Sequence, residues 1–146
     1  MSDDDVPAGF APLKRSSRFV ELVGPVYAKG EGGDLVLGMR ITEKHANVRG
    51  FTHGGALMTL ADIALGYTMS FSQDPPVSLA TASMTTDFAD AARIGDWVEA
   101  RADIQRIGST LAFANAYLTV EGRRIARASG VFAVLKAKLD ADASPD

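Results

Sequence analysis

One segment of the chain, residues 54–71, constrains the fold more than any other because it reads as a helix without a polar face. Its sequence, GGALMTLADIALGYTMSF, contains a single charged residue, Asp62. A surface helix carries a polar face, so a helix that is apolar on all sides is normally buried. The run Asp74-Pro75-Pro76 follows, and proline cannot continue a helix. We therefore predict one long buried helix. A membrane span is the competing interpretation, which the central carboxylate disfavours.

The segments around this helix have the patterns of β-strands joined by short turns. A short helix is expected over residues 16–23, and the strand candidates are residues 25–31, 34–42, 77–89, 97–106, 109–120 and 123–136. Long strands with short connections indicate an antiparallel meander. One helix inserted before a meander predicts an α+β domain, in which a curved antiparallel sheet of about five or six strands wraps around the helix.

Composition indicates a single soluble domain with acidic ends. The chain has 146 residues, of which 47% are hydrophobic and 23% charged, as in an ordinary globular protein. It contains no cysteine, which excludes disulfides and cysteine nucleophiles. We predict a disordered acidic tail over residues 1–14, one domain over 15–138 and a second disordered acidic tail over 139–146. The acidic start has no apolar segment like that of a signal peptide, so we expect a cytoplasmic protein.

The formal net charge of −3 is distributed unevenly along the chain. Six of the 18 acidic residues lie near the two ends, which leaves 12 acids against 15 Lys and Arg residues in the body. A mildly basic body suits an anionic small molecule. It lacks the dense basic stripe of a nucleic-acid-binding protein.

The residues before the helix form a pattern with chemical content. Residues 45–62 read HANVRGFTHGGALMTLAD, so Gly54 and Gly55 open the helix. A helix N-terminus presents unpaired N–H groups and a positive dipole end, and glycines leave them uncovered for a ligand carbonyl. The side-chain amide of Asn47 could donate a second hydrogen bond. Asp62 lies about two turns or ~12 Å further along the helix. An antiparallel second copy in a two-fold dimer would bring Asp62 of one subunit near Gly54 of the other.

This HxNxxGxxHGGxxxxLAD pattern resembles that of the hotdog-fold acyl-CoA thioesterases of the phenylacetate-pathway and thioesterase-superfamily-2 type. The resemblance spans about residues 18–137 of the chain. It implies a hotdog fold and hydrolysis of an acyl-CoA thioester, with coenzyme A as part of the substrate and no separate cofactor or metal. It also implies a homodimer that assembles into a dimer-of-dimers tetramer, with neither nucleic acid nor membrane as a partner.

The resemblance also implies roles for individual residues. Asp62, reaching in from the partner subunit, is expected to be the general base or the nucleophile. The N–H of Gly54 would hold the thioester oxygen with help from Asn47, and Thr81 would orient the water. His53 is expected to shape the edge of the site. The expected substrate-binding residues are His53, Gly55, Met58, Leu65, Met69 and Arg93, the methionines and leucine along the acyl chain and Arg93 at the phosphates of coenzyme A.

Structural interpretations of the same residues stay open from the sequence. His45 and Asn47 are equally well explained as loop and turn residues, Thr81 as an ordinary strand residue, and Asp62 as a carboxylate bonded to a neighbouring strand. Two other functions are also open. One is a non-catalytic acyl-CoA-binding hotdog protein, and the other is a hotdog enoyl-CoA hydratase or dehydratase.

Overall fold

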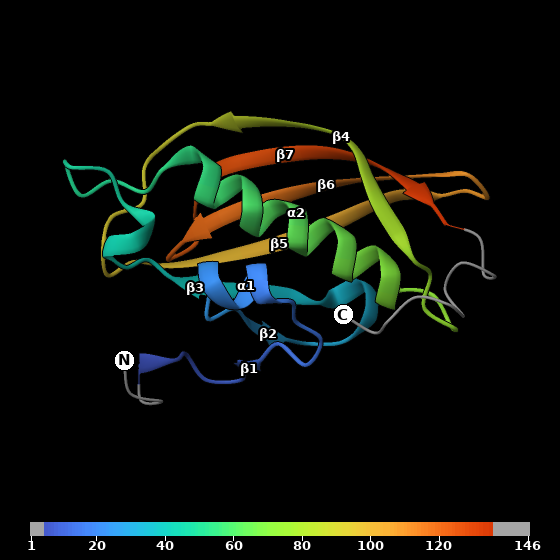
Figure 1. The fold of residues 1–146 in the computed structure, drawn as a ribbon, viewed down its shortest axis with the longest axis horizontal. Helices are drawn as coiled ribbons and strands as arrows, with labels where there is room; N and C mark the ends of the chain where they lie inside the picture. Colours follow the sequence, from blue (N-terminus) through green and yellow to red (C-terminus); the bar gives the residue numbers. More distant parts are fainter. Residues whose placement is uncertain (1–4, 136–146) are drawn as a thin grey trace.

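The computed structural model describes residues 5–135, and Figure 1 shows their arrangement. The helices are α1 (Arg18–Val23) and α2 (Gly54–Phe71), with 3-10 turns η2 (Gly32–Asp34) and η3 (Glu43–His45). The strands are β1 (Ala11–Pro12), β2 (Tyr27–Lys29), β3 (Val36–Arg40), β4 (Leu79–Phe88), β5 (Trp97–Ile107), β6 (Leu111–Val120) and β7 (Arg123–Val134). The long helix has the predicted bounds, and each predicted strand is present.

All strands belong to one antiparallel sheet with the order β1-β2-β3-β5-β6-β7-β4. The meander β5-β6-β7 is as predicted. The strand that follows α2 crosses to the far edge and pairs with β7 instead of β5. The sheet has seven strands, because the two-residue strand β1 adds one to those that the sequence predicts.

Strand β1 also corrects the predicted boundary of the N-terminal tail. Ala11 pairs with Ala28 of β2. The ring of Phe10 packs edge-on against Trp97, with ring centroids 5.1 Å apart. The segment that the sequence assigns to a disordered tail over residues 1–14 therefore contributes to the folded body before residue 15. Residues 1–4 and the predicted C-terminal tail lie outside the described residues.

Helix α2 lies in the concave face of the curved sheet, as Figure 1 shows. Its buried side includes Leu57, Leu60, Leu65 and Met69. The helix can approach closely because half of the buried positions of β6 and β7 are alanine, and because Gly130 has no side chain where a Cβ would lie only 2.8 Å from Leu65 Cδ1. Close packing of large helix side chains over small strand residues produces one continuous core. A curved antiparallel sheet around a single long helix is the hotdog architecture that the resemblance implies.

The opposite side of α2 is only half-buried. Asp62, Gly66, Tyr67 and Ser70 are all intermediate in exposure, and Gly55 is exposed. The apolar character of the segment is therefore used on the sheet side, while the other side borders a pocket. Among the described residues, no helix is long and apolar enough to cross a membrane.

Candidate functional site

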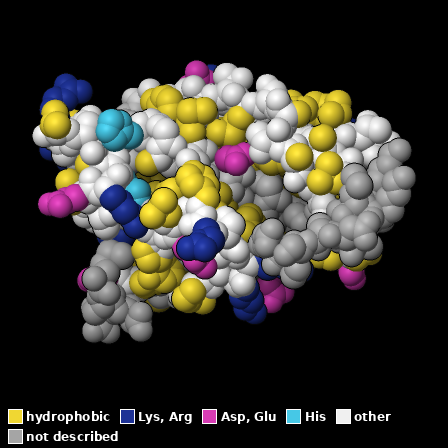
Figure 2. Space-filling model, viewed as in Figure 1, with side chains coloured by type: hydrophobic (Ala, Val, Ile, Leu, Met, Phe, Trp, Pro, Cys, Tyr) yellow, Lys and Arg dark blue, Asp and Glu magenta, His cyan; other side chains and the backbone are white. Residues whose placement is uncertain are grey.

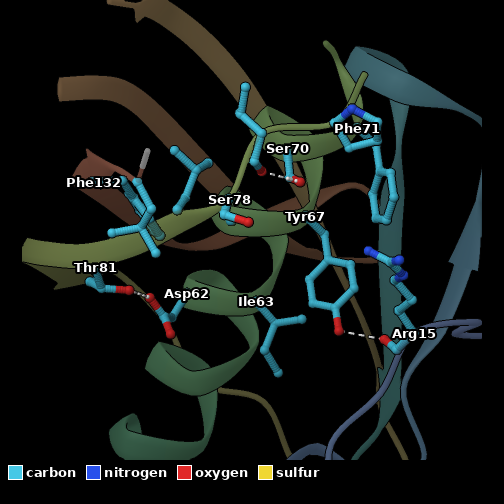
Figure 3. A pocket seen from close by; sticks show the side chains of 14 residues that line it. Arg15, Asp62, Ile63, Tyr67, Ser70, Phe71, Ser78, Thr81 and Phe132 are labelled. Atoms are coloured by element: carbon cyan, nitrogen blue, oxygen red, sulfur yellow. Dashed lines mark hydrogen bonds between the residues drawn. The ribbon is translucent and has the colours of Figure 1, made fainter. Parts of the chain in front are cut away.

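Asp62 and Thr81 form a hydrogen-bonded pair between the middle of α2 and the edge strand β4. The Thr81 hydroxyl donates to Asp62 Oδ1 at 2.6 Å (Figure 3). The β4–β7 register shifts between Thr81 and Ser83, and a bulge of this kind re-aims side chains. The other carboxylate oxygen, Oδ2, has no hydrogen-bond partner among residues 5–135. The structural interpretation of Asp62 predicts a bond to a neighbouring strand, and this bond is present. It occupies only one of the two carboxylate oxygens.

The pair lies at a pocket of about 430 Å³ between α2 and the start of β4. Its apolar walls include Ile63, Val77, Leu79 and Phe132. In Figure 3 Asp62 and Thr81 lie on one side of this pocket, and Tyr67 and Arg15 lie on the other. A pocket with apolar walls and a carboxylate on one side is suited to a ligand with an apolar body and a reactive polar group.

Two serines stabilise the end of the pocket beyond α2. Ser70 Oγ donates to the carbonyl oxygen of Val77 at 2.6 Å, and Ser72 Oγ donates to that of Met69 at 2.7 Å. The bond from Ser70 ties the last turn of the helix to the segment that enters β4, and the bond from Ser72 lies within the end of the helix itself. The entrance to β4, and with it Thr81, is thereby fixed relative to the helix that carries Asp62.

A second group of predicted residues lies at the other end of α2, around its N-terminus. Gly54 lies close to Phe88: a Cβ added at Gly54 would be 3.0 Å from the phenyl ring. A Cβ added at Gly55 would meet no atom within 4 Å. The first N–H groups of a helix have no intrahelical acceptor. His53 is exposed and its side chain makes no capping bond. The helix entrance is thus open to a ligand at Gly55 and bordered by an aromatic ring at Gly54.

Asn47 has the role of a turn residue that the structural interpretation predicts. Its Oδ1 accepts hydrogen bonds from the backbone N–H of Arg49 at 2.9 Å and of Phe51 at 3.2 Å. Its amide nitrogen has no partner within the described part of the chain. Asn47 therefore shapes the loop before α2 with its oxygen and retains two N–H donors.

The two groups of residues do not meet within one chain. The pocket is lined by Asp62 and Thr81 but by none of Asn47, His53, Gly54 and Gly55. Eight residues separate Gly54 from Asp62 on one continuous helix, which corresponds to about 12 Å at the usual rise. One chain carries the two halves at separate places, as the sequence predicts.

The predicted acyl-binding residues need a correction. Leu65 and Met69 are fully buried between α2 and the sheet, and neither lines the pocket, nor does the half-buried Met58. The helix face that borders the pocket instead carries Asp62, Ile63, Gly66, Tyr67 and Ser70. Spacing by four residues from Asp62 identifies Gly66 and Ser70, so part of this wall could have been found from the sequence. Arg15 and Phe132 could not, because only the tertiary fold brings them to the helix.

Arg93 lies near the helix entrance and not in the pocket. Its guanidinium carbon is 4.7 Å from the centroid of the Phe51 ring, and that of Arg49 is 5.8 Å from the same centroid. Phe51 and Arg93 are also joined by an isolated β-bridge. Two cations therefore flank one aromatic ring in the loop that leads into α2, a favourable arrangement for both charges.

His45 is a structural residue. It is buried, its Nδ1 accepts from the backbone N–H of Thr42, and its Nε2 bonds the carbonyl oxygen of Val23. Because Nδ1 accepts, Nε2 carries the proton and donates. The interpretation of His45 as a loop residue is confirmed.

The fold and this site define a hotdog protein with a pocket that is lined by a carboxylate of the central helix. A family model described as the thioesterase superfamily matches residues 49–126. "Putative esterase PA0474" of Pseudomonas aeruginosa is 46% identical over 129 residues, which cover 88% of this chain and 96% of that protein. The chain belongs to the thioesterase superfamily, and the resemblance seen in the sequence is confirmed.

Two further relatives agree with this assignment. Acyl-coenzyme A thioesterase 13 of Mus musculus is 34% identical over 104 residues, covering 70% of this chain and 71% of that protein. The crystal structure of zebrafish thioesterase superfamily member 2 has a TM-score of 0.70 and 28% sequence identity, covering 75% of this chain and 81% of the other.

Proposed function

We propose that the protein hydrolyses the thioester of an acyl-coenzyme A to the free acid and coenzyme A. The observation that carries the proposal is the Asp62–Thr81 pair on one side of an apolar-walled pocket, in a member of the thioesterase superfamily. The name of the mouse relative, an acyl-coenzyme A thioesterase, supports coenzyme A as the thiol.

Asp62 carries the chemical step. In the first route, its free carboxylate oxygen takes a proton from water as the water attacks the thioester carbonyl. The carbon–sulfur bond then breaks, and the departing thiolate takes a proton from Asp62. In the second route, Asp62 attacks the carbonyl itself, the carbon–sulfur bond breaks, and the departing thiolate takes a proton from solvent. Water then hydrolyses the mixed anhydride, which releases the free acid and regenerates the Asp62 carboxylate. Both routes use a carboxylate oxygen that is not occupied by Thr81, and both are forms of general-base or nucleophilic catalysis.

The negative charge that develops on the carbonyl oxygen is stabilised by the second group of residues. The N–H of Gly54 at the positive end of α2 and the amide of Asn47 are donors suited to an oxyanion. Because Gly54 lies about 12 Å from Asp62 along one helix, and Asn47 lies in the loop before that helix, the working site takes Asp62 from one subunit and these donors from its partner. The edge strand β4 supports such a dimer, since no other strand within residues 5–135 pairs with its outer edge, and a free edge favours pairing with another strand.

The surface supports a dimer at the same face. Hydrophobic side chains are gathered over β4 and around α2 on the face that Figure 2 shows. The exposed large hydrophobic residues include Phe19 and Leu22 of α1 and Phe88 of β4. Large apolar side chains exposed on one molecule support an association site. We propose a homodimer as the catalytic unit, which assembles further into a dimer of dimers.

The phosphates of coenzyme A are proposed to bind near Arg93 and Arg49. Both guanidinium groups flank Phe51 in the loop before α2, and arginine suits phosphate oxygens. Coenzyme A would then approach from the helix entrance, with Gly55 open on the way. The acyl group would enter the pocket beside Asp62.

The test is a panel of acyl-coenzyme A thioesters with detection of the released thiol, together with an enoyl-coenzyme A assayed for hydration. We expect thiol release from the wild-type protein and no hydration. Asp62→Asn keeps the size of the side chain but removes both base and nucleophile. It should lower turnover by about 100- to 10,000-fold, with the melting temperature and coenzyme A binding nearly unchanged.

Other outcomes would contradict this function. Tight acyl-coenzyme A binding without thiol release would identify a non-catalytic binding protein. Hydration of the enoyl group would identify a hydratase. Turnover of Asp62→Asn within a few-fold of wild type would defeat the mechanism even if hydrolysis occurred.

A further inference from the structure

The pocket beside Asp62 shares a wall with a second, larger cavity. The second cavity has a volume of about 610 Å³ and lies between the N-terminal segment, β2 and the last turns of α2. Arg15, Tyr67 and Phe71 line both cavities. The apolar residues Ala11, Leu13 and Leu35 line the second cavity only. These shared residues therefore separate the pocket of the carboxylate from a space that is also lined by apolar side chains.

Tyr67 is held in place at this shared wall. Its hydroxyl donates a hydrogen bond to the backbone carbonyl oxygen of Arg15, as Figure 3 shows. Its ring lies against Phe71 with the centroids 5.9 Å apart. Burial raises the pKa of the Tyr67 phenol, and the nearby charge of Arg15 opposes this only in part. The phenol therefore stays protonated at neutral and mildly alkaline pH, and it keeps its donor to Arg15.

The position of Tyr67 on the helix limits the depth of the pocket. It follows Asp62 by five residues, which is roughly 7.5 Å along the helix axis at the usual rise. An acyl group whose carbonyl lies at Asp62 and whose chain follows the helix meets the phenol ring after a few carbons. Between them lies Gly66, whose missing side chain leaves the floor of the pocket open.

From this geometry we propose that Tyr67, which is hydrogen-bonded to the Arg15 carbonyl oxygen, determines the acyl specificity because its ring limits the length of the pocket. The enzyme then prefers short or compact acyl groups, and the cavity behind the ring is closed to the substrate. This inference rests on the proposed thioesterase function of the same pocket.

The experiment compares kcat/KM for butanoyl- and dodecanoyl-coenzyme A in wild type, Tyr67→Ala and Tyr67→Phe. Removing the ring joins the two cavities, so that the longer acyl chain can bury additional methylene groups in the second one. Tyr67→Ala should therefore raise the ratio of dodecanoyl to butanoyl kcat/KM on the order of tenfold or more. Tyr67→Phe keeps the ring and loses only its hydrogen bond, so its ratio should stay within about threefold of wild type. Tyr67→Leu removes the ring but keeps an apolar side chain that can pack at the wall, and it should shift the ratio in the same direction.

Tyr117→Ala is the matched control. Tyr117 is also a half-buried tyrosine, but it lies on β6 and lines neither cavity. Its removal should leave the ratio unchanged. A folded Tyr67→Ala or Tyr67→Leu protein with the wild-type ratio would overturn the inference while the thioesterase function stands, and so would a wild-type preference for dodecanoyl-coenzyme A. Absence of hydrolysis with every thioester would instead overturn the proposed function, and this inference with it.

Discussion

At the residue scale, the contact between Thr81 and Asp62 decides how the carboxylate is presented. Thr81 lies on the exposed edge strand, yet its hydroxyl reaches a helix residue at 2.6 Å. A hydrogen bond to a charged group is stronger than one between neutral groups. The bond fixes one carboxylate oxygen and leaves the other for the reaction.

Replacing Thr81 tests this positioning role. Thr81→Val keeps the shape of the side chain and removes the hydroxyl, so we expect kcat to fall on the order of tenfold, the equivalent of about 1.5 kcal/mol. Thr81→Ser keeps the hydroxyl and should retain activity within about threefold of wild type. Ser83→Ala on the same strand is the control, because Ser83 does not line the pocket. Steady-state kinetics on the same thioester are the measurement, and a Thr81→Val enzyme as active as wild type would contradict the role.

Gly66 offers a prediction about stability. It lies inside α2, where glycine is less favourable than alanine by roughly 0.5–1 kcal/mol. A Cβ at this position would lie 3.5 Å from the Phe132 ring, an ordinary contact. Gly66→Ala should therefore raise the free energy of unfolding by about that amount. It should also reduce activity on bulky acyl groups, because the methyl narrows the pocket. Urea titrations of the wild-type protein and of Gly66→Ala, at the same protein concentration, measure the free energy of unfolding. A lower urea midpoint for Gly66→Ala would contradict the predicted gain in stability.

At the element scale, the sequence predicts a helix over about residues 54–71, in agreement with α2, because local signals lie at or near both of its ends. Glycines open it at Gly54, and prolines follow it at Pro75 and Pro76. Strand β1 is different. It has two residues, one of them Pro12, and only its pairing with β2 makes it a strand. Pairing partners distant in sequence leave no periodic pattern, which is also why the crossing of β4 to β7 could not be predicted.

The position of β4 at the edge leads to a prediction about assembly. If two copies pair through β4 about a two-fold axis, residues near the middle of the strand lie close to their own counterparts. Thr85→Lys would then place like charges near each other across the axis, which is destabilising. We expect it to raise the dimer dissociation constant on the order of tenfold, seen by sedimentation velocity. Ser129→Lys is the control, since Ser129 pairs with Thr85 from the interior strand β7. Equal effects of both lysines would argue against pairing through β4.

At the scale of the whole molecule, the motif and the pocket contribute different parts of the site. The residues 45–62 predict Asp62, Gly54 and Asn47, and the structure places them on one helix and its preceding loop. The walls of the pocket beside Asp62 come from segments far apart in the sequence, and they include Arg15 and Phe132. A local sequence motif can predict functional residues that lie close together in the sequence. The residues that line a cavity depend instead on which helices and strands the fold brings together. Leu65 and Met69 show the same limit, because apolar residues on a helix look alike until one face is covered by the sheet.

The central claim is that each active site takes Asp62 from one subunit and the oxyanion donors from its partner. Asn47→Asp keeps the oxygen that holds the loop but removes the amide donor. Alone it should lower kcat about 100-fold or more, and Asp62→Asn should be at least as inactive. The decisive measurement is the activity of purified mixed dimers, with one subunit carrying each substitution. One of their two sites contains both native residues, so we expect roughly half of the wild-type activity. Mixed dimers no more active than either parent would contradict the shared site.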